Sequence, residues 1–338
     1  MPRLRLCFSG AGHLLPYHLG VSWTVLEHFH QKEIRKRAPY HKNQTSKFKD
    51  VKANSNFLPP ITDVSGSSSG AIAAVVVSKI PHRIEEFAHR FITDRGKALE
   101  TLSSMLLDEE RHWMSNTISN AESDRCDTEN ILNTSIERRF RNTSNLHIAT
   151  TKCKDGSLKL FKFSNNQVFK TISSNWNTDK IIEAVTASCT IPASFHPVDI
   201  FSKSVNLSYP DSEGIFIDGE FYVDGAISAP APLPHNRNEK EEAIYITVSP
   251  ISFTECSDSG EQNSFRISPN DDSWRLIPFR NIKCRGQFLV KPSIQNLRAL
   301  RVASGITTSA ELQEWYDRGV EDGEQFIEDW RYIMSKKQ

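Results

Sequence analysis

A Gly-x-Ser-x-Gly pentapeptide, bounded by Gly66 and Gly70, constrains the fold of this chain more than any other feature. It follows the apolar residues Ile61 and Val64 and leads directly into an apolar run at residues 71–77. Flanking glycines allow a sharp turn between a strand and a helix, so that the central hydroxyl projects from the backbone. A flexible Ser/Gly turn would not be expected to run into an unbroken apolar stretch. The pattern therefore predicts a strand–turn–helix unit with Ser68 as the nucleophile.

A second glycine-rich junction lies near the N-terminus. Residues 4–8 read as a short strand, and residues 14–29 have the spacing of a helix with one apolar face. The loop between them presents backbone N–H groups, which can bind a phosphate or the oxyanion of an acyl-transfer intermediate. It lacks the third glycine of a dinucleotide fingerprint and the Gly-Lys-Ser/Thr of a P-loop, which favours the oxyanion role. The predicted oxyanion loop consists of Gly10, Ala11, Gly12 and His13.

A third segment places an aspartate at the end of a strand. Residues 221–223 read as the strand, and Asp224 is followed by a tight turn at Gly225 and Ala226. A carboxylate held there can accept the proton of a serine hydroxyl. With an ordinary pKa of about 3.9 it would be a weak base in water, so a dry site in contact with the serine would have to compensate. The dipeptide alone favours an ordinary Asp-Gly hairpin turn, like the nearby Asp218 and Gly219.

Together the three segments resemble the patatin-like phospholipase family. Gly10 to Gly12 are similar to its oxyanion loop, Ser68 to its nucleophile, and Asp224 to the base of its Ser–Asp dyad, in the same order along the chain. Residues 187–198 are similar to the family's Ala-Ser-x-x-Ile-Pro-x-x-Phe-x-Pro segment. The resemblance covers about residues 3 to 250. It departs at Leu15, where members commonly carry glycine, and at Ala11, which replaces the middle glycine of the loop.

The resemblance implies a three-layer α/β fold, in which helices cover both faces of a mainly parallel sheet. It implies a lipid acyl hydrolase of the phospholipase A or triacylglycerol lipase type, which cleaves carboxylic esters through an acyl-serine intermediate without metal or cofactor. Its substrate would be a glycerolipid or phospholipid, met at a membrane or lipid-droplet surface. A transacylase that uses the same dyad, or an inactive lipid-surface scaffold, are the alternatives.

A Ser-Asp-His triad of the α/β-hydrolase type is a rival mechanism, with His196 or His235 as the base. The hydrolase nucleophile normally follows several strands, whereas Ser68 follows one obvious strand. The dyad is therefore the favoured interpretation.

Independently of the resemblance, strands alternate with helices, which indicates a mainly parallel sheet covered on both faces. Functional loops of such sheets lie at the carboxyl ends of the strands, where Gly10, Ser68 and Asp224 all fall. Strands are expected at residues 4–8, 61–65, 147–151, 158–163, 221–223 and 243–248. Helices are expected at residues 17–29, 69–78, 84–91, 128–139, 179–187, 294–303 and 309–330.

The resemblance implies a catalytic domain at residues 1–250, followed by a polar loop and a C-terminal helical extension at residues 251–338, which we expect to pack on the same domain. Residues 32–54 form a basic insertion with eight Lys or Arg against Glu33 and Asp50. This insertion could rest on anionic lipid, or it could be a solvated loop.

The charge balance argues against nucleic acid as a partner, because 41 basic residues stand against 41 acidic ones. The six cysteines have neither Cys-x-x-Cys nor zinc spacing, which is typical of free thiols in a reducing compartment. The chain also lacks a calcium-loop motif. The first strand begins near residue 4, which leaves no room for a signal peptide in this numbering. We therefore expect a cytoplasmic location, or a peripheral one on membranes or lipid droplets.

Overall fold

The computed structural model describes residues 3–37, 59–94, 97–122, 145–164, 178–196, 208–233, 243–255, 264–271, 273–274, 281–284 and 288–336. The basic insertion at residues 32–54 lies outside these ranges except for its first six residues. The helix expected at residues 128–139 and His235 also lie outside them.

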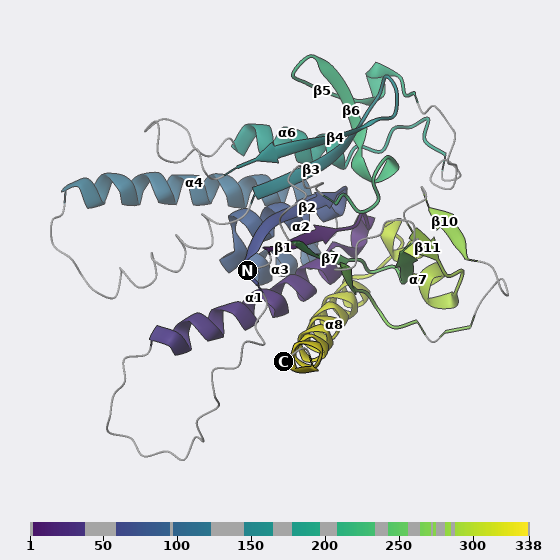
Figure 1. Cartoon of the computed structure of the whole chain (residues 1–338). Helices are drawn as coiled ribbons and strands as arrows, with labels where there is room; N and C mark the ends of the chain where they lie inside the picture. Colours follow the sequence, from purple (N-terminus) through teal and green to yellow (C-terminus); the bar gives the residue numbers. More distant parts are fainter. Residues whose placement is uncertain are drawn as a thin grey trace.

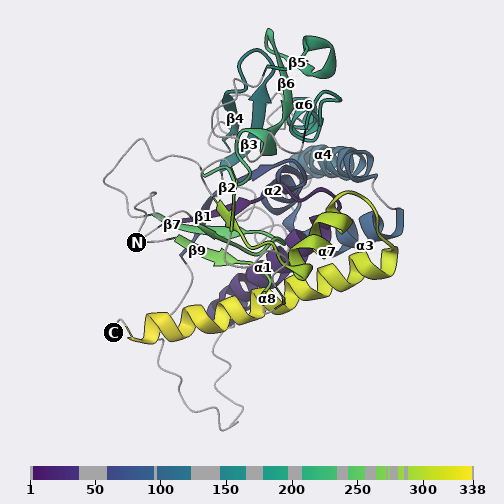
Figure 2. The same ribbon diagram turned by 90° about the vertical axis from the view of Figure 1, so that its right-hand side faces the viewer.

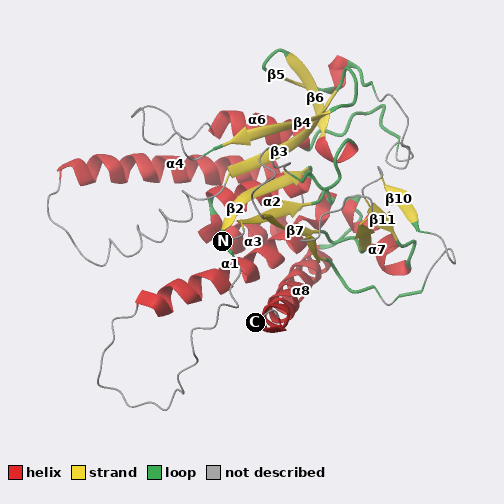
Figure 3. Cartoon of the chain, in the orientation of Figure 1, coloured by secondary structure: helices red, strands yellow, loops and turns green. Residues whose placement is uncertain are grey.

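Two sheets and a set of helices make up the described part of the chain (Figures 1 and 3). The strands are β1 (Arg3–Phe8), β2 (Ile61–Ser67), β3 (Asn145–Lys152), β4 (Leu158–Phe163), β5 (Ile215–Ile217), β6 (Glu220–Asp224), β7 (Ala243–Val248), β8 (Phe253–Glu255), β9 (Ser264–Ile267), β10 (Ile282–Cys284) and β11 (Phe288–Val290). The α-helices are α1 (Leu15–Arg37), α2 (Ser69–Lys79), α3 (Ile84–Asp94), α4 (Ala98–Glu122), α6 (Thr178–Ser188), α7 (Ile294–Ala303) and α8 (Ser309–Lys336).

The central sheet is mixed but mainly parallel, with the strand order β5-β6-β3-β2-β1-β7-β9 and β4 paired to β3. Its middle strands run parallel, since β1 pairs with β2 and β7, β2 with β3, and β7 with β9. Successive residues of a strand point to opposite faces, yet all of β1 after Arg3 is buried, so both faces are covered at the centre. The predicted three-layer α/β fold is confirmed.

Strand β3 brings together two strands that never pair with each other. One edge of β3 is taken by β4 along residues 146–151, so β2 and β6 share the other edge, end to end. Ser67, the last residue of β2, pairs with Ala149, and Asp224, the last residue of β6, pairs with the neighbouring Thr150. The carboxyl ends of β2 and β6 therefore meet beside the middle of β3.

The last helix, α8, packs along α1, which follows the N-terminal glycine loop (Figure 2). Two glycines let the helices approach closely: a Cβ on Gly20 would lie 2.2 Å from the Tyr316 carbonyl oxygen, and one on Gly319 would lie 2.3 Å from that of Tyr17. The Tyr17 hydroxyl donates a 2.7 Å hydrogen bond to Asp322. The C-terminal segment thus fixes the helix that carries the loop.

The structure adds elements that the sequence analysis does not predict. Helix α4 buries Leu102, Met105 and Leu106 within its first half, whereas its second half is polar, so its apolar periodicity is short. Strands β5, β8, β9, β10 and β11 have only three or four residues each. None of the described helices combines the length and apolar character that crossing a bilayer requires.

Candidate active site

The turn between β2 and α2 holds Ser68 in a conformation that side chains rarely adopt, with φ of 52° and ψ of −131°. Its glycines have no room for a side chain. A Cβ on Gly66 would lie 2.0 Å from the Gly70 carbonyl oxygen, and one on Gly70 would lie 2.5 Å from the Phe8 carbonyl oxygen. The turn is therefore compact, touches the end of β1, and leaves Ser68 partly exposed.

The three serines of the pentapeptide have different hydrogen-bond partners. The Ser67 hydroxyl donates to the Pro230 carbonyl at 3.0 Å, and the Ser69 hydroxyl accepts the Ala11 backbone N–H at 3.0 Å. The Ser68 hydroxyl bonds to the Asp224 carboxylate. Among these three hydroxyls, that of Ser68 thus has the contact with a base that a nucleophile requires.

Asp224 is 3% exposed, and its burial raises the pKa of the carboxyl to about 6, against opposing hydrogen bonds from Ser68 and the Ala226 backbone N–H. The Ala226 bond is 2.7 Å long. The Asp224 backbone is also fixed, because its N–H donates to the Thr190 carbonyl and its carbonyl accepts from the Thr151 hydroxyl. Burial in this position makes the carboxylate a stronger base than an aspartate in water.

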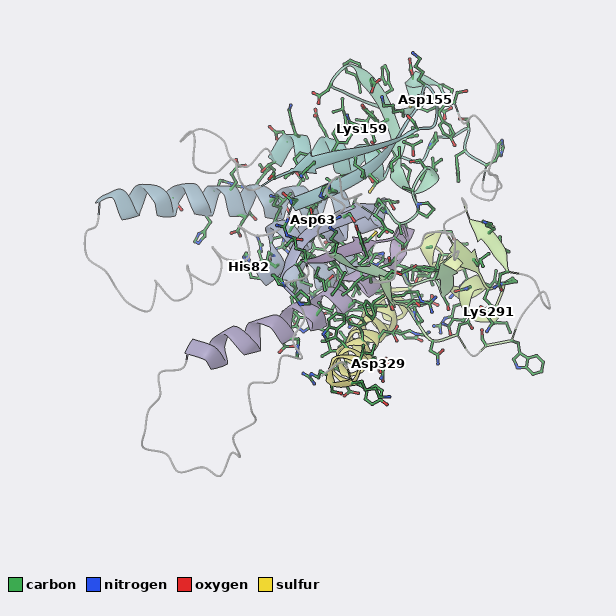
Figure 4. All side chains as sticks on the ribbon, in the orientation of Figure 1. Asp63, His82, Asp155, Lys159, Lys291 and Asp329 are labelled. Carbon is green, nitrogen blue, oxygen red and sulfur yellow. The ribbon has the colours of Figure 1, made fainter. Side chains whose placement is uncertain are left out.

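Two other aspartates of the sheet differ from Asp224 in their exposure or in the direction of their pKa shift. Asp218 is exposed on the turn between β5 and β6, with φ of 49°. Asp63 is buried near the start of β2 and is labelled in Figure 4. Burial would raise the pKa of Asp63, but hydrogen bonds from His147, Asn145 and Thr62 and the charge of Arg5 lower it to about 2. Two buried aspartates of one sheet thus have pKa values shifted in opposite directions.

The N-terminal glycine loop reaches the same place from β1. The backbone N–H of Gly10 donates to the Pro230 carbonyl at 2.9 Å, and that of Ala11 donates to Ser69. Within the described ranges, the N–H of Gly12 has no hydrogen-bond acceptor, and Gly12 is exposed. Its φ of 53° favours glycine. Of the amides of Gly10, Ala11 and Gly12, that of Gly12 is therefore the one available to a ligand.

His13, the last residue of the predicted oxyanion loop, packs on its surroundings through its ring. The ring centroid lies 6.3 Å from that of Phe91, and a Cβ on Gly305 would lie 3.1 Å from the ring. The oxyanion role of the four loop residues stays a prediction.

Gly10 lies where the three motifs converge. A Cβ on Gly10 would lie 2.6 Å from the Ala226 Cβ and 3.4 Å from the Ser68 Cβ. Gly225 is equally confined, because its Cβ would lie 2.0 Å from the Ala149 carbonyl oxygen. The structure thus brings the predicted loop, nucleophile and base together at the carboxyl ends of β1, β2 and β6.

Sequence reasoning assigned no role to Ser188, the last residue of α6. Its hydroxyl accepts the Ser68 backbone N–H at 2.9 Å and donates to the Ala149 carbonyl at 2.6 Å. Ser188 belongs to the segment at residues 187–198 that is similar to the family pattern, which is the signal that could have found it.

The described bonds of the Asp224 carboxylate involve Ser68 and Ala226 but no histidine. His196 is exposed. Cys189 lies near Asp224, and burial together with that charge raises the pKa of its thiol well above the usual range, which keeps it protonated. In the described ranges, no three His, Cys, Asp or Glu side chains are grouped to hold a metal ion.

Comparison with known proteins places these motifs within one matched region. A family model described as patatin-like phospholipase matches residues 6–235, which include all three motifs. Among solved structures, the chain is similar to VipD from Legionella pneumophila, with 13% sequence identity, a TM-score of 0.38, and coverage of 97% of this chain and 67% of that one. No curated protein matches the chain.

Proposed function

The chain belongs to the patatin-like phospholipase family, a family of lipid acyl hydrolases, and we propose that Ser68 and Asp224 are its catalytic dyad. The observation that carries the proposal is the contact between the Ser68 hydroxyl and a buried carboxylate whose pKa is raised to about 6. A base with a pKa near the working pH is well suited to accept a proton and to return it.

In the first half of the reaction, the Ser68 oxygen attacks the carbonyl carbon of the ester while the Asp224 carboxylate accepts the hydroxyl proton. The carbonyl oxygen becomes an oxyanion, stabilised by the Gly12 N–H and by the positive end of α2, which begins at Ser69. The intermediate then breaks its bond to the alcohol, which leaves with the proton from Asp224. The product on the enzyme is acyl-Ser68.

In the second half, a water molecule attacks the acyl carbon and gives its proton to Asp224. The second tetrahedral intermediate releases a fatty acid, and Asp224 returns the proton to the Ser68 oxygen. Each step uses groups of this chain and water alone. A transacylase would replace the water with an alcohol or lysolipid and otherwise use the same residues.

The test is hydrolysis of a water-soluble short-chain ester, together with labelling by a fluorophosphonate. Ser68→Ala should abolish both, because the labelled oxygen is removed. Ser67→Ala is the matched control, since its hydroxyl is bonded to Pro230 and not to Asp224. Full labelling of the Ser68→Ala protein would show that another residue is the nucleophile.

Substituting the histidines distinguishes the Ser–Asp dyad from a Ser-Asp-His triad. Asp224→Asn should lower kcat by about 10² or more, whereas His196→Ala and His235→Ala should have little effect. If substituting either histidine lowered activity as much as Ser68→Ala does, the dyad mechanism would be contradicted.

A glycerolipid or phospholipid as substrate, and peripheral binding to a membrane or lipid droplet in the cytoplasm, are also part of the proposal. A lipid panel offered with and without an acceptor alcohol distinguishes hydrolase from transacylase. It also distinguishes both from an inactive scaffold, which would release no fatty acid from any of these lipids.

A further inference from the structure

Helix α7 exposes a row of large apolar side chains. Ile294, Leu297 and Leu300 are 52%, 56% and 52% exposed, and their spacing of three residues puts them on one side of the helix. The opposite side, formed by Asn296, Ala299 and Val302, is buried. An amphipathic helix normally turns its apolar side chains inward, so the exposed row requires an explanation.

Two further exposed apolar residues lie next to the ends of the helix. At its start, the Ile294 N–H donates a 3.2 Å hydrogen bond to the carbonyl of Trp274, whose side chain is 83% exposed. Lys291, labelled in Figure 4, holds the Trp274 segment in place by donating to the Asp271 and Ser273 carbonyls. Past the end of the helix, Ile306 is 65% exposed. We call these five residues the α7 face: Trp274, Ile294, Leu297, Leu300 and Ile306.

The element that carries this face touches the catalytic loop. A Cβ on Gly12 would lie 2.2 Å from the Ala303 carbonyl oxygen at the end of α7. Gly305, just after the helix, lies beside the His13 ring. Figure 1 shows α7 beside β10 and β11, on the opposite side of the molecule from α4. The end of the helix that carries the α7 face therefore lies against the Gly12 loop of the proposed Ser68 site.

The charged residues of α7 are neutralised within the chain. Arg298 donates to Glu314 at 2.7 Å, and both Arg298 and Arg301 contact Glu311. The α7 face consequently offers apolar area without a free positive charge among these side chains. Such a face suits insertion into an uncharged lipid surface rather than attraction to an anionic one.

We propose that the α7 face docks the protein on the surface of a neutral or zwitterionic lipid phase. This inference rests on the proposed function, because a lipid ester that is insoluble in water has to be met at its own surface. A group of exposed apolar side chains is costly in water and favourable in the acyl boundary of a lipid layer. Docking there presents the Gly12 loop to the ester group of the lipid.

The test uses the Ser68→Ala protein and phosphatidylcholine vesicles, so that binding is measured without hydrolysis. Leu297→Gln with Leu300→Gln should weaken vesicle binding by about tenfold or more, because two side chains no longer enter the apolar layer. Glutamine is a good helix former and both positions are exposed, so α7 should stay folded. The loss should be the same at low and high salt.

The matched control is Leu107→Gln, which removes a leucine that is 41% exposed on α4. It should leave vesicle binding unchanged. In the active protein, the α7 double variant should hydrolyse vesicle lipid more slowly but a soluble short-chain ester at the normal rate.

Unchanged vesicle affinity of the double variant, with its helix content intact, would overturn the proposal. A change from dimer to monomer with unchanged vesicle binding would also overturn it, in favour of a second copy of the chain as the occupant. Failure of the proposed function has a different signature: the unaltered protein would bind vesicles through the α7 face yet hydrolyse no soluble ester.

Discussion

The backbone N–H of Ser68 donates a 2.9 Å hydrogen bond to the side chain of Ser188. The same hydroxyl donates to the Ala149 carbonyl, so a single side chain joins the Ser68 turn to β3 and to the end of α6. The strained turn at Ser68 is thus supported from a segment 120 residues away in the sequence.

Ser188→Ala should destabilise the protein and slow catalysis. It leaves the Ser68 N–H without its acceptor, which costs about 1–3 kcal/mol of unfolding free energy when the donor is buried. We expect a lower kcat with little change in KM, measured on a soluble ester, and a lower midpoint in denaturant. Ser194→Ala, an exposed serine of the same segment, is the control. Wild-type stability and kcat for Ser188→Ala would refute this role.

The pH dependence of hydrolysis should follow Asp224. Burial raises the pKa of this carboxyl to about 6, and only the ionised form can accept the Ser68 proton. The rate constant kcat/KM should therefore rise as pH increases through about 6 and level off above it. A rising limb centred near pH 4, where an ordinary aspartate titrates, would mean that Asp224 is not the base.

Asp224→Asn should make the fold more stable near neutral pH, although we expect it to lower kcat by about 10² or more. The native pKa of about 6 lies above the unfolded value of about 3.9, so the native state binds the proton more tightly. The stability from this proton is present below about pH 4 and is lost as pH rises through about 6. The melting temperature of Asp224→Asn, relative to wild type, should accordingly be higher at pH 7 than at pH 4.

Asp63→Asn provides a control of opposite sign. The native pKa of Asp63 is lowered to about 2, so its ionised form stabilises the fold above about pH 4, and that stability is lost as pH falls towards 2. Asp63→Asn should destabilise the protein at pH 7 and progressively less below pH 4. If both variants shift the melting temperature in the same direction at pH 7, the assigned pKa shifts are wrong.

Ser69→Ala should loosen the glycine loop without removing the nucleophile. The Ser69 hydroxyl is the acceptor of the Ala11 N–H, and without it the loop loses its bond to the turn. We expect kcat to fall by about tenfold while Ser68 is still labelled by a fluorophosphonate. Ser69→Thr keeps the hydroxyl and should restore part of the rate. Equal rates for Ser69→Ala and Ser69→Thr would indicate that the bond to Ala11 does not matter.

Local patterns were sufficient to predict much of the fold. The glycine pentapeptide followed by an apolar run predicted the junction of β2 and α2, and the bounds expected for β4, β7 and α7 match those of the structure. Short edge strands and the half-polar α4 carry too few periodic residues to be recognised.

The long-range contacts of the site could not be predicted from the sequence. The acceptor of the Ala11 N–H is 58 residues away, and that of the Gly10 N–H is the carbonyl of Pro230, so no local pattern shows which loop amides are occupied. The pKa of Asp224 depends on burial by segments that are distant in the sequence. The sequence motifs and the resemblance identified Ser68 and Asp224 as candidates. The hydrogen bonds of these residues to Ser188 and Ala226 could be found only in the folded chain.

The end-to-end arrangement of β2 and β6 on one edge of β3 has a consequence for how this chain tolerates change. Ser67 pairs with Ala149, and Asp224 pairs with Thr150, the next residue of the same strand. The spacing of the Ser68 turn and Asp224 is therefore independent of the length of the peptide that connects them. Insertions into the connecting loops would leave that spacing unaltered, whereas slipping β6 by one residue along β3 would turn the Asp224 side chain to the opposite face of the sheet.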